Sequence, residues 1–165
     1  MTPTASKPDL RRIGERAFAE VLDTLWSLPA SVRASADNPP VSATPDELSS
    51  LVHLTGQRLS GSVRLRLPPA FVADAVRRLT GLEGDVGITD ELRQDAVGEF
   101  ANLVAGRVAS QLAAVGYPCQ LGTPLVARNA SLRADNQNGG VRGRSDLICA
   151  GHCLSLEFQF CYTDP

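Results

Sequence analysis

The sequence predicts an α+β domain in which helices pack on one face of a largely antiparallel sheet. Helical periodicity is the first observation, because apolar residues recur at steps of three and four in residues 8–28, 68–80 and 90–115. Strand-type alternation is the second, and it occurs between residues 50 and 68 and again toward the C-terminus. The order of these segments contains no repeated strand-helix-strand unit, which argues against a parallel α/β sheet.

One domain, residues 1–165, accounts for the whole chain. With 165 residues, 43% of them hydrophobic and 21% charged, the chain is long enough for one core and short for two. We expect residues 1–7 to form a flexible leader. Residues 29–47 are rich in Pro and Ser, residues 133–144 are rich in Gly and Asn, and neither has a period, so both are expected to be mobile loops.

The N-terminal half combines one helix with a strand pair and a second helix. The apolar stripe of the first helix is made of Leu10, Ile13, Ala17, Val21, Leu25 and Leu28. In the strand pair, Arg64 and Arg66 alternate with apolar residues, so one face of the sheet is expected to be buried and the other to be wet. Pro68 and Pro69 can open the second helix, and a glycine-rich loop follows it.

The C-terminal part is predicted to add about three strands. Residues 119–132 indicate a strand that is interrupted at residues 122–124. The last strands form a hairpin with a tight turn at Gly151 and His152.

A long helix over residues 90–115 is the main element of the prediction. Thr89 or Asp90 can cap it, and Gly116 and Pro118 end it. At about 100° per residue its apolar face contains Val97, Ala101, Val104, Val108, Leu112 and Val115. The opposite side carries a narrow polar row made of Asp95, Glu99, Asn102 and Gly106.

Composition and motifs exclude several functions. The formal net charge of −2 gives no basic surface for nucleic acid. No apolar run is long enough to be a signal core or a membrane span, so a cytoplasmic protein is expected. The motifs GxGxxG, GxxxxGK[ST], HExxH and GxSxG do not occur. Cys149, His152 and Cys153 resemble part of a metal site without a clear fourth ligand, so no metal is expected in this chain.

The polar row is therefore the candidate site. Glu99 and Asn102 are three residues apart and project together, and Asp95 lies one turn before them. A glycine inside a helix costs about 1 kcal/mol relative to alanine, so Gly98 and Gly106 suggest the close approach of another backbone. Spacing alone leaves two interpretations open, a solvated polar face and a docking surface for a partner.

At this helix the sequence resembles the CheC/CheX/FliY family of chemotaxis phosphatases, and its CheX-like members with a single motif in particular. The family motif is Asp or Ser, then Glu, Asn and a distant Pro, which here are Asp95, Glu99, Asn102 and Pro124. The gap between Asn and Pro is one residue shorter than usual. The resemblance extends over roughly residues 11–124.

The resemblance implies a phosphatase that acts on the aspartyl phosphate of a CheY-like response regulator. Glu99 and Asn102 would be the catalytic residues, and Asp95, Gly98 and Gly106 would contact the partner. Asn102 would orient the attacking water, and Glu99 would pair with a cation of the regulator. This chain would bind no cofactor, because the required Mg²⁺ would belong to the regulator. The resemblance also implies a homodimer.

Two other functions stay open at this point. The same helix could dock a receiver domain or another signalling protein without catalysis. Alternatively, an unrelated α+β domain could carry the polar row only as a solvated surface.

Overall fold

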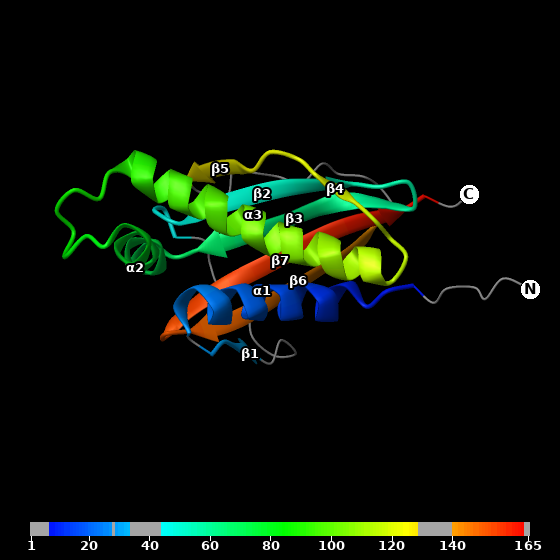
Figure 1. Ribbon diagram of the computed structural model, residues 1–165, viewed down its shortest axis with the longest axis horizontal. Coiled ribbons are helices and arrows are strands. Elements are labelled where there is room, and N and C mark those ends of the chain that lie inside the picture. Colours follow the sequence, from blue (N-terminus) through cyan, green and yellow to red (C-terminus); the bar gives the residue numbers. More distant parts are fainter. Residues whose placement is uncertain (1–6, 28, 34–43, 129–139, 164–165) are drawn as a thin grey trace, which may run out of the picture.

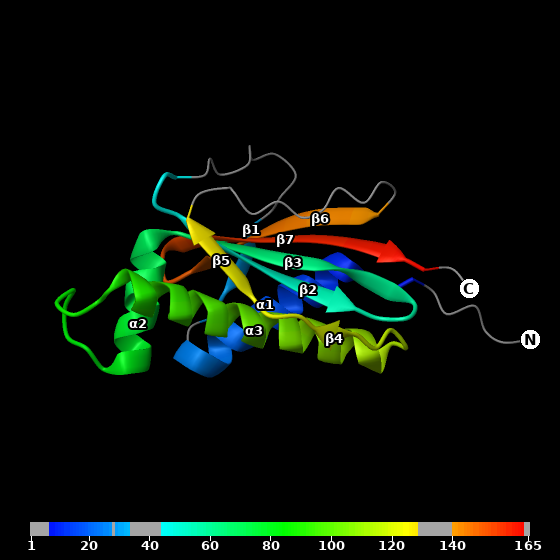
Figure 2. The same ribbon diagram turned by 90° about the horizontal axis from the view of Figure 1, so that it is seen from above.

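The computed structural model describes residues 7–27, 29–33, 44–128 and 140–163. It confirms the predicted α+β class: a mostly antiparallel sheet carries its helices on one face (Figures 1 and 2). The helices are α1 (Leu10–Trp26), α2 (Pro69–Thr80) and α3 (Asp90–Ala114). The strands are β1 (Ser31–Arg33), β2 (Leu48–Thr55), β3 (Leu59–Leu67), β4 (Gln120–Leu121), β5 (Leu125–Arg128), β6 (Val141–Cys149) and β7 (His152–Tyr162).

The sheet is ordered β1-β6-β7-β3-β2-β4, and β5 also pairs with β2. β4 pairs with the end of β2 at Leu54 and Thr55, whereas β5 pairs with its first half, from Leu48 to Leu51. The two short strands thus follow the same edge of β2, which explains the predicted interruption at residues 122–124. This arrangement carries the connection between β4 and β5 alongside α3.

α1 and α3 lie side by side across the helix-bearing face, with α2 at one end (Figure 1). Asp9 caps α1, because its side chain accepts a hydrogen bond from the backbone N–H of Arg12. Phe18 of α1 is fully buried, and its ring lies 5.7 Å from that of Phe100 in α3. The predicted stripe is thereby largely confirmed, although Leu25 is 37% exposed and Leu28 lies outside the described residues.

α3 begins where the sequence indicated, and ends earlier. The Thr89 hydroxyl accepts a hydrogen bond from the Leu92 N–H at 3.2 Å, which caps the first turn. The helix stops at Ala114, and the N–H of Tyr117 donates to the Leu112 carbonyl. The assignment of Val115 to the buried face is therefore wrong: Val115 is exposed, and Tyr117 is buried in its place.

The helix-free face of the sheet is not wet where Arg64 and Arg66 lie, which corrects the sequence-based expectation. Only 9% of the Arg66 side chain is exposed, and its guanidinium is 3.0 Å from Glu47 and 3.5 Å from Glu157. Arg64 pairs with Glu157 at 3.3 Å. Arginines can be buried here because one buried carboxylate, Glu47, and one half-buried carboxylate, Glu157, neutralise them.

Two predicted loops contain strand residues. Residues 31–33 form β1, which pairs with β6, so the predicted loop 29–47 is wrong there. The predicted loop 133–144 is wrong from Val141 onward, because β6 begins at that residue. Residues 34–43 and 129–139 lie outside the described part of the chain, so the expectation of mobile loops there stays a prediction.

The last hairpin turns one residue earlier than expected. Ala150 and Gly151 have φ values of 49° and 78°, which is the backbone of a two-residue hairpin turn. His152 is the first residue of β7 and pairs with Cys149.

Candidate functional site

The polar row lies on the exposed side of α3. Helical geometry places Val97, Ala101, Val104, Val108 and Leu112 against the sheet, and all of them are buried. On the other side of the helix, Asp95 and Glu99 are exposed, and Asn102 is half-buried. At a rise of 1.5 Å per residue, Glu99 and Asn102 are separated by about 4.5 Å along the helix axis. Both side chains can therefore reach the same small group on a partner.

The polar groups of the row are not used within the described part of the chain. There, the side chains of Asp95, Glu99 and Asn102 form no hydrogen bond or ion pair. By contrast, Asp90 at the start of the helix is paired with Arg128, and Gln111 near its end contacts Glu20. Two carboxylates and one carboxamide thus remain available to an external partner.

Pro124, which is separated in sequence from the rest of the motif, lies beside the row in the folded chain. A methyl group in place of the Gly98 hydrogen would be 3.9 Å from the Pro124 Cγ and 3.6 Å from the Val126 Cγ2. These are ordinary van der Waals contacts. The tertiary structure therefore brings the four motif residues to one side of α3.

The two glycines of α3 have neighbours in their own chain. Gly98 is buried and faces Pro124 and Val126. Gly106 is half-buried, and a methyl group there would lie 3.8 Å from the Leu121 Cδ1. A methyl group would therefore fit at both positions within this chain, and the role of either glycine in binding a partner stays a prediction.

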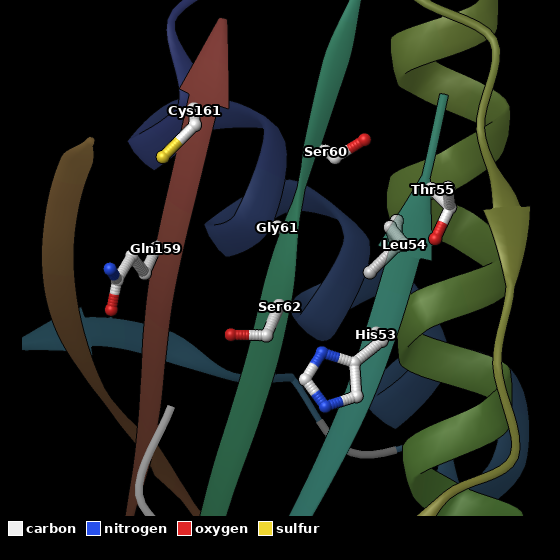
Figure 3. A pocket seen from close by; sticks show the side chains of 8 residues that line it. All are labelled: His53, Leu54, Thr55, Ser60, Gly61, Ser62, Gln159 and Cys161. Atoms are coloured by element: carbon white, nitrogen blue, oxygen red, sulfur yellow. The ribbon is translucent and has the colours of Figure 1, made fainter. Parts of the chain in front are cut away.

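A hollow of about 180 Å³ lies on the opposite face of the sheet, and sequence reasoning did not find it. Figure 3 shows its lining side chains on β2, β3 and β7, with the helices behind the sheet. These residues are His53, Leu54, Thr55, Ser60, Gly61, Ser62, Gln159 and Cys161. The lining carries no carboxylate, lysine or arginine, and the hollow is smaller than the roughly 300 Å³ of typical ligand sites. It is a weaker candidate than the row.

A second hollow, of about 280 Å³, lies near the first turn of α3. Asp46, Asp90, Arg93 and Arg128 contribute charges of both signs to its lining. The Asp90–Arg128 ion pair partly neutralises these charges. The sequence offered no signal for this hollow, because its residues come from four separate segments.

The residues that resembled part of a metal site are used elsewhere. The imidazole Nε2 of His152 is 3.3 Å from an Asp74 carboxylate oxygen, and Cys149 is fully buried. Burial raises the pKa of the Cys149 thiol, and the charge of Arg78 opposes this increase. Within the described ranges, no three His, Cys, Asp or Glu residues are grouped so that they could hold a metal ion. None of the described helices is long and apolar enough to cross a membrane.

Comparison with known proteins gives one family match. The sequence profile of the family described as chemotaxis phosphatase CheX matches residues 48–143, which include α3 and the whole motif. No curated protein matches the chain.

Solved structures share the fold at low sequence identity. CheX from Vibrio vulnificus is similar with a TM-score of 0.75 and 19% identity, over 93% of this chain and 97% of that one. A complex of CheX with CheY, BeF₃ and Mg²⁺ from Borrelia burgdorferi gives a TM-score of 0.68 and 16% identity, over 93% of this chain and 99% of that one. FliY from Thermotoga maritima is similar with a TM-score of 0.60 and 20% identity, over 99% of this chain and 92% of that one.

Proposed function

This chain belongs to the chemotaxis phosphatase CheX family, and on this premise we propose that it hydrolyses the aspartyl phosphate of a CheY-like response regulator. The observation that carries the proposal is the exposed row of α3, whose Asp95, Glu99 and Asn102 side chains are unpaired in the described structure. The Borrelia burgdorferi complex supports the choice of partner, because there a protein of the same fold is bound to CheY.

The reaction needs a positioned water more than a strong base. An acyl phosphate is already activated, so a water held in line with the bond to be broken can attack phosphorus. The bond between phosphorus and the aspartyl oxygen breaks, and inorganic phosphate and a free aspartate carboxylate result. The Asn102 carboxamide can accept from this water and donate to its neighbours, and it brings no negative charge to the phosphoryl group.

Glu99 would bind the partner instead of the phosphoryl group. Its carboxylate would be repelled by a phosphoryl group at close range, whereas it would attract a cation beside the phosphorylation site. Asp95 lies one turn earlier and adds a second negative charge that would help to orient the partner. Gly106 would leave room for the partner at the far end of the row, and Gly98 would belong to the same partner-binding side of the helix.

The regulator would supply the metal. The partner's own carboxylates would hold Mg²⁺, which would neutralise charge on the phosphoryl group, and this chain would contribute the water-positioning carboxamide and the cation-binding carboxylate. The active site would thus be assembled from two proteins.

A homodimer in the cytoplasm is a further part of the proposal. β1, the last strand at this edge of the described sheet, pairs with β6 only at residues 146–148. A second copy could extend the sheet there. Sedimentation of the purified chain would test this, and a monomer at all concentrations would contradict it.

The phosphatase proposal is tested by the decay of a phosphorylated receiver domain from the same organism. We expect the wild-type chain to accelerate decay, and Asn102→Ala to lower kcat by about a hundredfold because the water loses its orientation. Glu99→Ala should mainly weaken binding. Gln94→Ala is a matched control, because it removes an exposed carboxamide from the same helix about 100° around the axis from Asp95.

The same experiment separates phosphatase activity from docking without catalysis. A docking module would bind the receiver, lose binding on Glu99→Ala, and leave the phosphate lifetime unchanged. Equal decay with wild-type, Asn102→Ala and no added protein, for every receiver tried, would refute the phosphatase function.

A further inference from the structure

The polar row lies between two apolar borders. Figure 1 shows α3 between α1 on one side and β4 with β5 on the other. On the α1 side, Leu25 and Leu103 are 37% and 38% exposed. On the strand side, Leu121 is 42% exposed and Pro124 is half-buried. Water-exposed leucines on both sides of an unpaired polar row are typical of a protein interface, in which apolar contacts surround a polar centre.

The border on the α1 side contains a small notch. Leu103 follows Asn102 by one residue and therefore points about 100° around the helix axis, toward α1. There it lines a hollow of about 70 Å³ together with Val21, Thr24, Leu25 and Arg107. Small-molecule sites begin at roughly 300 Å³, so this notch suits one side chain of a protein partner better than a free ligand.

The border on the strand side is set by the sheet register. Leu121 is paired with Leu54, which belongs to the core beneath the helices, so both side chains lie on the helix-bearing face. Leu121 also lies beside Gly106, at the far end of the row. By contrast, Leu125 is paired with Leu51, which is opposite Arg64, so Leu125 points to the helix-free face.

We propose that these two apolar borders, Leu25 with Leu103 and Leu121 with Pro124, form the binding surface for the phosphorylated receiver domain, whereas the polar row performs the chemistry. This inference rests on the proposed function. Two observations identify the receiver domain as the partner. The borders directly flank the polar row, and the two carboxylates of the row favour a partner surface that has a cation between apolar side chains. A receiver whose phosphoryl group enters the row must cover both borders.

The two parts of the surface then have separate kinetic effects. Apolar contacts at the borders are the same in the bound ground state and the transition state, so their loss raises KM and leaves kcat unchanged. Removal of the Asn102 carboxamide lowers kcat. Both Leu103 and Leu121 still expose about two fifths of their surface, so covering either one should strengthen binding by about three- to tenfold.

The experiment compares Leu103→Ser and Leu121→Ser with a matched control, Leu125→Ser. Two readouts are used: the decay rate of the phosphorylated receiver against its concentration, and the Kd for the receiver loaded with beryllofluoride and Mg²⁺. We expect the two border variants to raise KM and Kd by about three- to tenfold at unchanged kcat, and the control to change neither. Leu103→Met, which keeps the apolar surface, should restore wild-type values, and urea unfolding verifies that each variant is folded.

The outcomes distinguish this inference from the phosphatase proposal. If wild-type accelerates decay and the border variants behave like Leu125→Ser, the borders are not the binding surface. If wild-type binds the beryllofluoride-loaded receiver without accelerating decay, and the border variants weaken that binding, the binding-surface inference is supported and the phosphatase proposal is refuted. Absence of binding by wild-type to every receiver overturns both. A change in self-association of the border variants at unchanged Kd assigns the surface to a second copy of this chain and also overturns the inference.

Discussion

Replacing the α3 glycines by alanine should stabilise the protein. Glycine in a helix interior costs about 0.5–1 kcal/mol relative to alanine, because the unfolded chain loses more conformational freedom on folding. At Gly98 a methyl group would be 3.6 Å from its nearest neighbour, and at Gly106 it would be 3.8 Å away. Neither contact forces a shift, so we expect Gly98→Ala and Gly106→Ala each to raise the free energy of unfolding by about 0.5–1 kcal/mol.

Gly14 in α1 offers a matched comparison with the opposite sign. A methyl group there would lie 2.7 Å from the Cδ2 of Leu156, which is fully buried. Overpacking of a core costs about 1–3 kcal/mol, which exceeds the gain in helix propensity. Gly14→Ala should therefore destabilise the fold, although it is the same glycine-to-alanine substitution in the same protein.

Urea unfolding followed by circular dichroism measures all three variants. For a chain of this size, 1 kcal/mol corresponds to about 2–4 °C in Tm, so thermal unfolding gives an independent check. Destabilisation by Gly98→Ala or Gly106→Ala would show that there is no room for a methyl group beside α3 at that position. Stabilisation by Gly106→Ala together with weaker receiver binding would indicate that glycine is needed at this position for binding the partner and not for folding.

Three other predictions concern the Glu47 ion pair, the Asp74 carboxylate and the thiols. Glu47→Ala should destabilise the protein by about 3 kcal/mol in urea unfolding, because the buried guanidinium of Arg66 would lose its 3.0 Å ion pair with this carboxylate; a variant as stable as wild-type would contradict the pairing. The hydrogen bond from Arg77 lowers the pKa of Asp74 below its ordinary value of 3.8, and His152 adds to this against the opposing effect of burial. Because the folded pKa is the lower one, Asp74→Asn should cost stability at neutral pH, and the difference from wild-type should vanish as the pH falls below 3.8; a difference that persists in acid would refute this. Cys149 is fully buried with a raised pKa, so a thiol reagent should label the half-buried cysteines first and reach Cys149 only on unfolding, as mass spectrometry of the labelled peptides would show.

The fold class could be predicted because its signals are local. The helical period of 3.6 residues assigns Val104 to the buried side of α3 and Asn102 to the polar side without any knowledge of neighbouring elements. Thr89 indicates the first turn, because it is a favourable N-cap residue. β1 could not be found in this way. It has three residues in a Pro- and Ser-rich segment, and it exists because β6 offers an edge.

The burial of Arg64 and Arg66 also escaped sequence reasoning. An alternating Arg pattern indicates a wet face unless carboxylates are brought to it. Glu47 precedes β2 and Glu157 lies in β7, so only the sheet order could show that both reach these arginines.

For the candidate site, the sequence by itself determined the polar row, since Asp95, Glu99, Asn102 and Gly106 share a helix side through backbone geometry alone. Only the tertiary structure decided what surrounds that row. The pairing of β4 and β5 with β2 carries Leu121 and Pro124 to one side of α3, and the packing of α1 carries Leu25 to the other. The physical reason is that helix periodicity is a property of consecutive residues, whereas a binding surface is made by long-range strand pairing and helix packing, which bury the apolar core and leave these side chains at its edge.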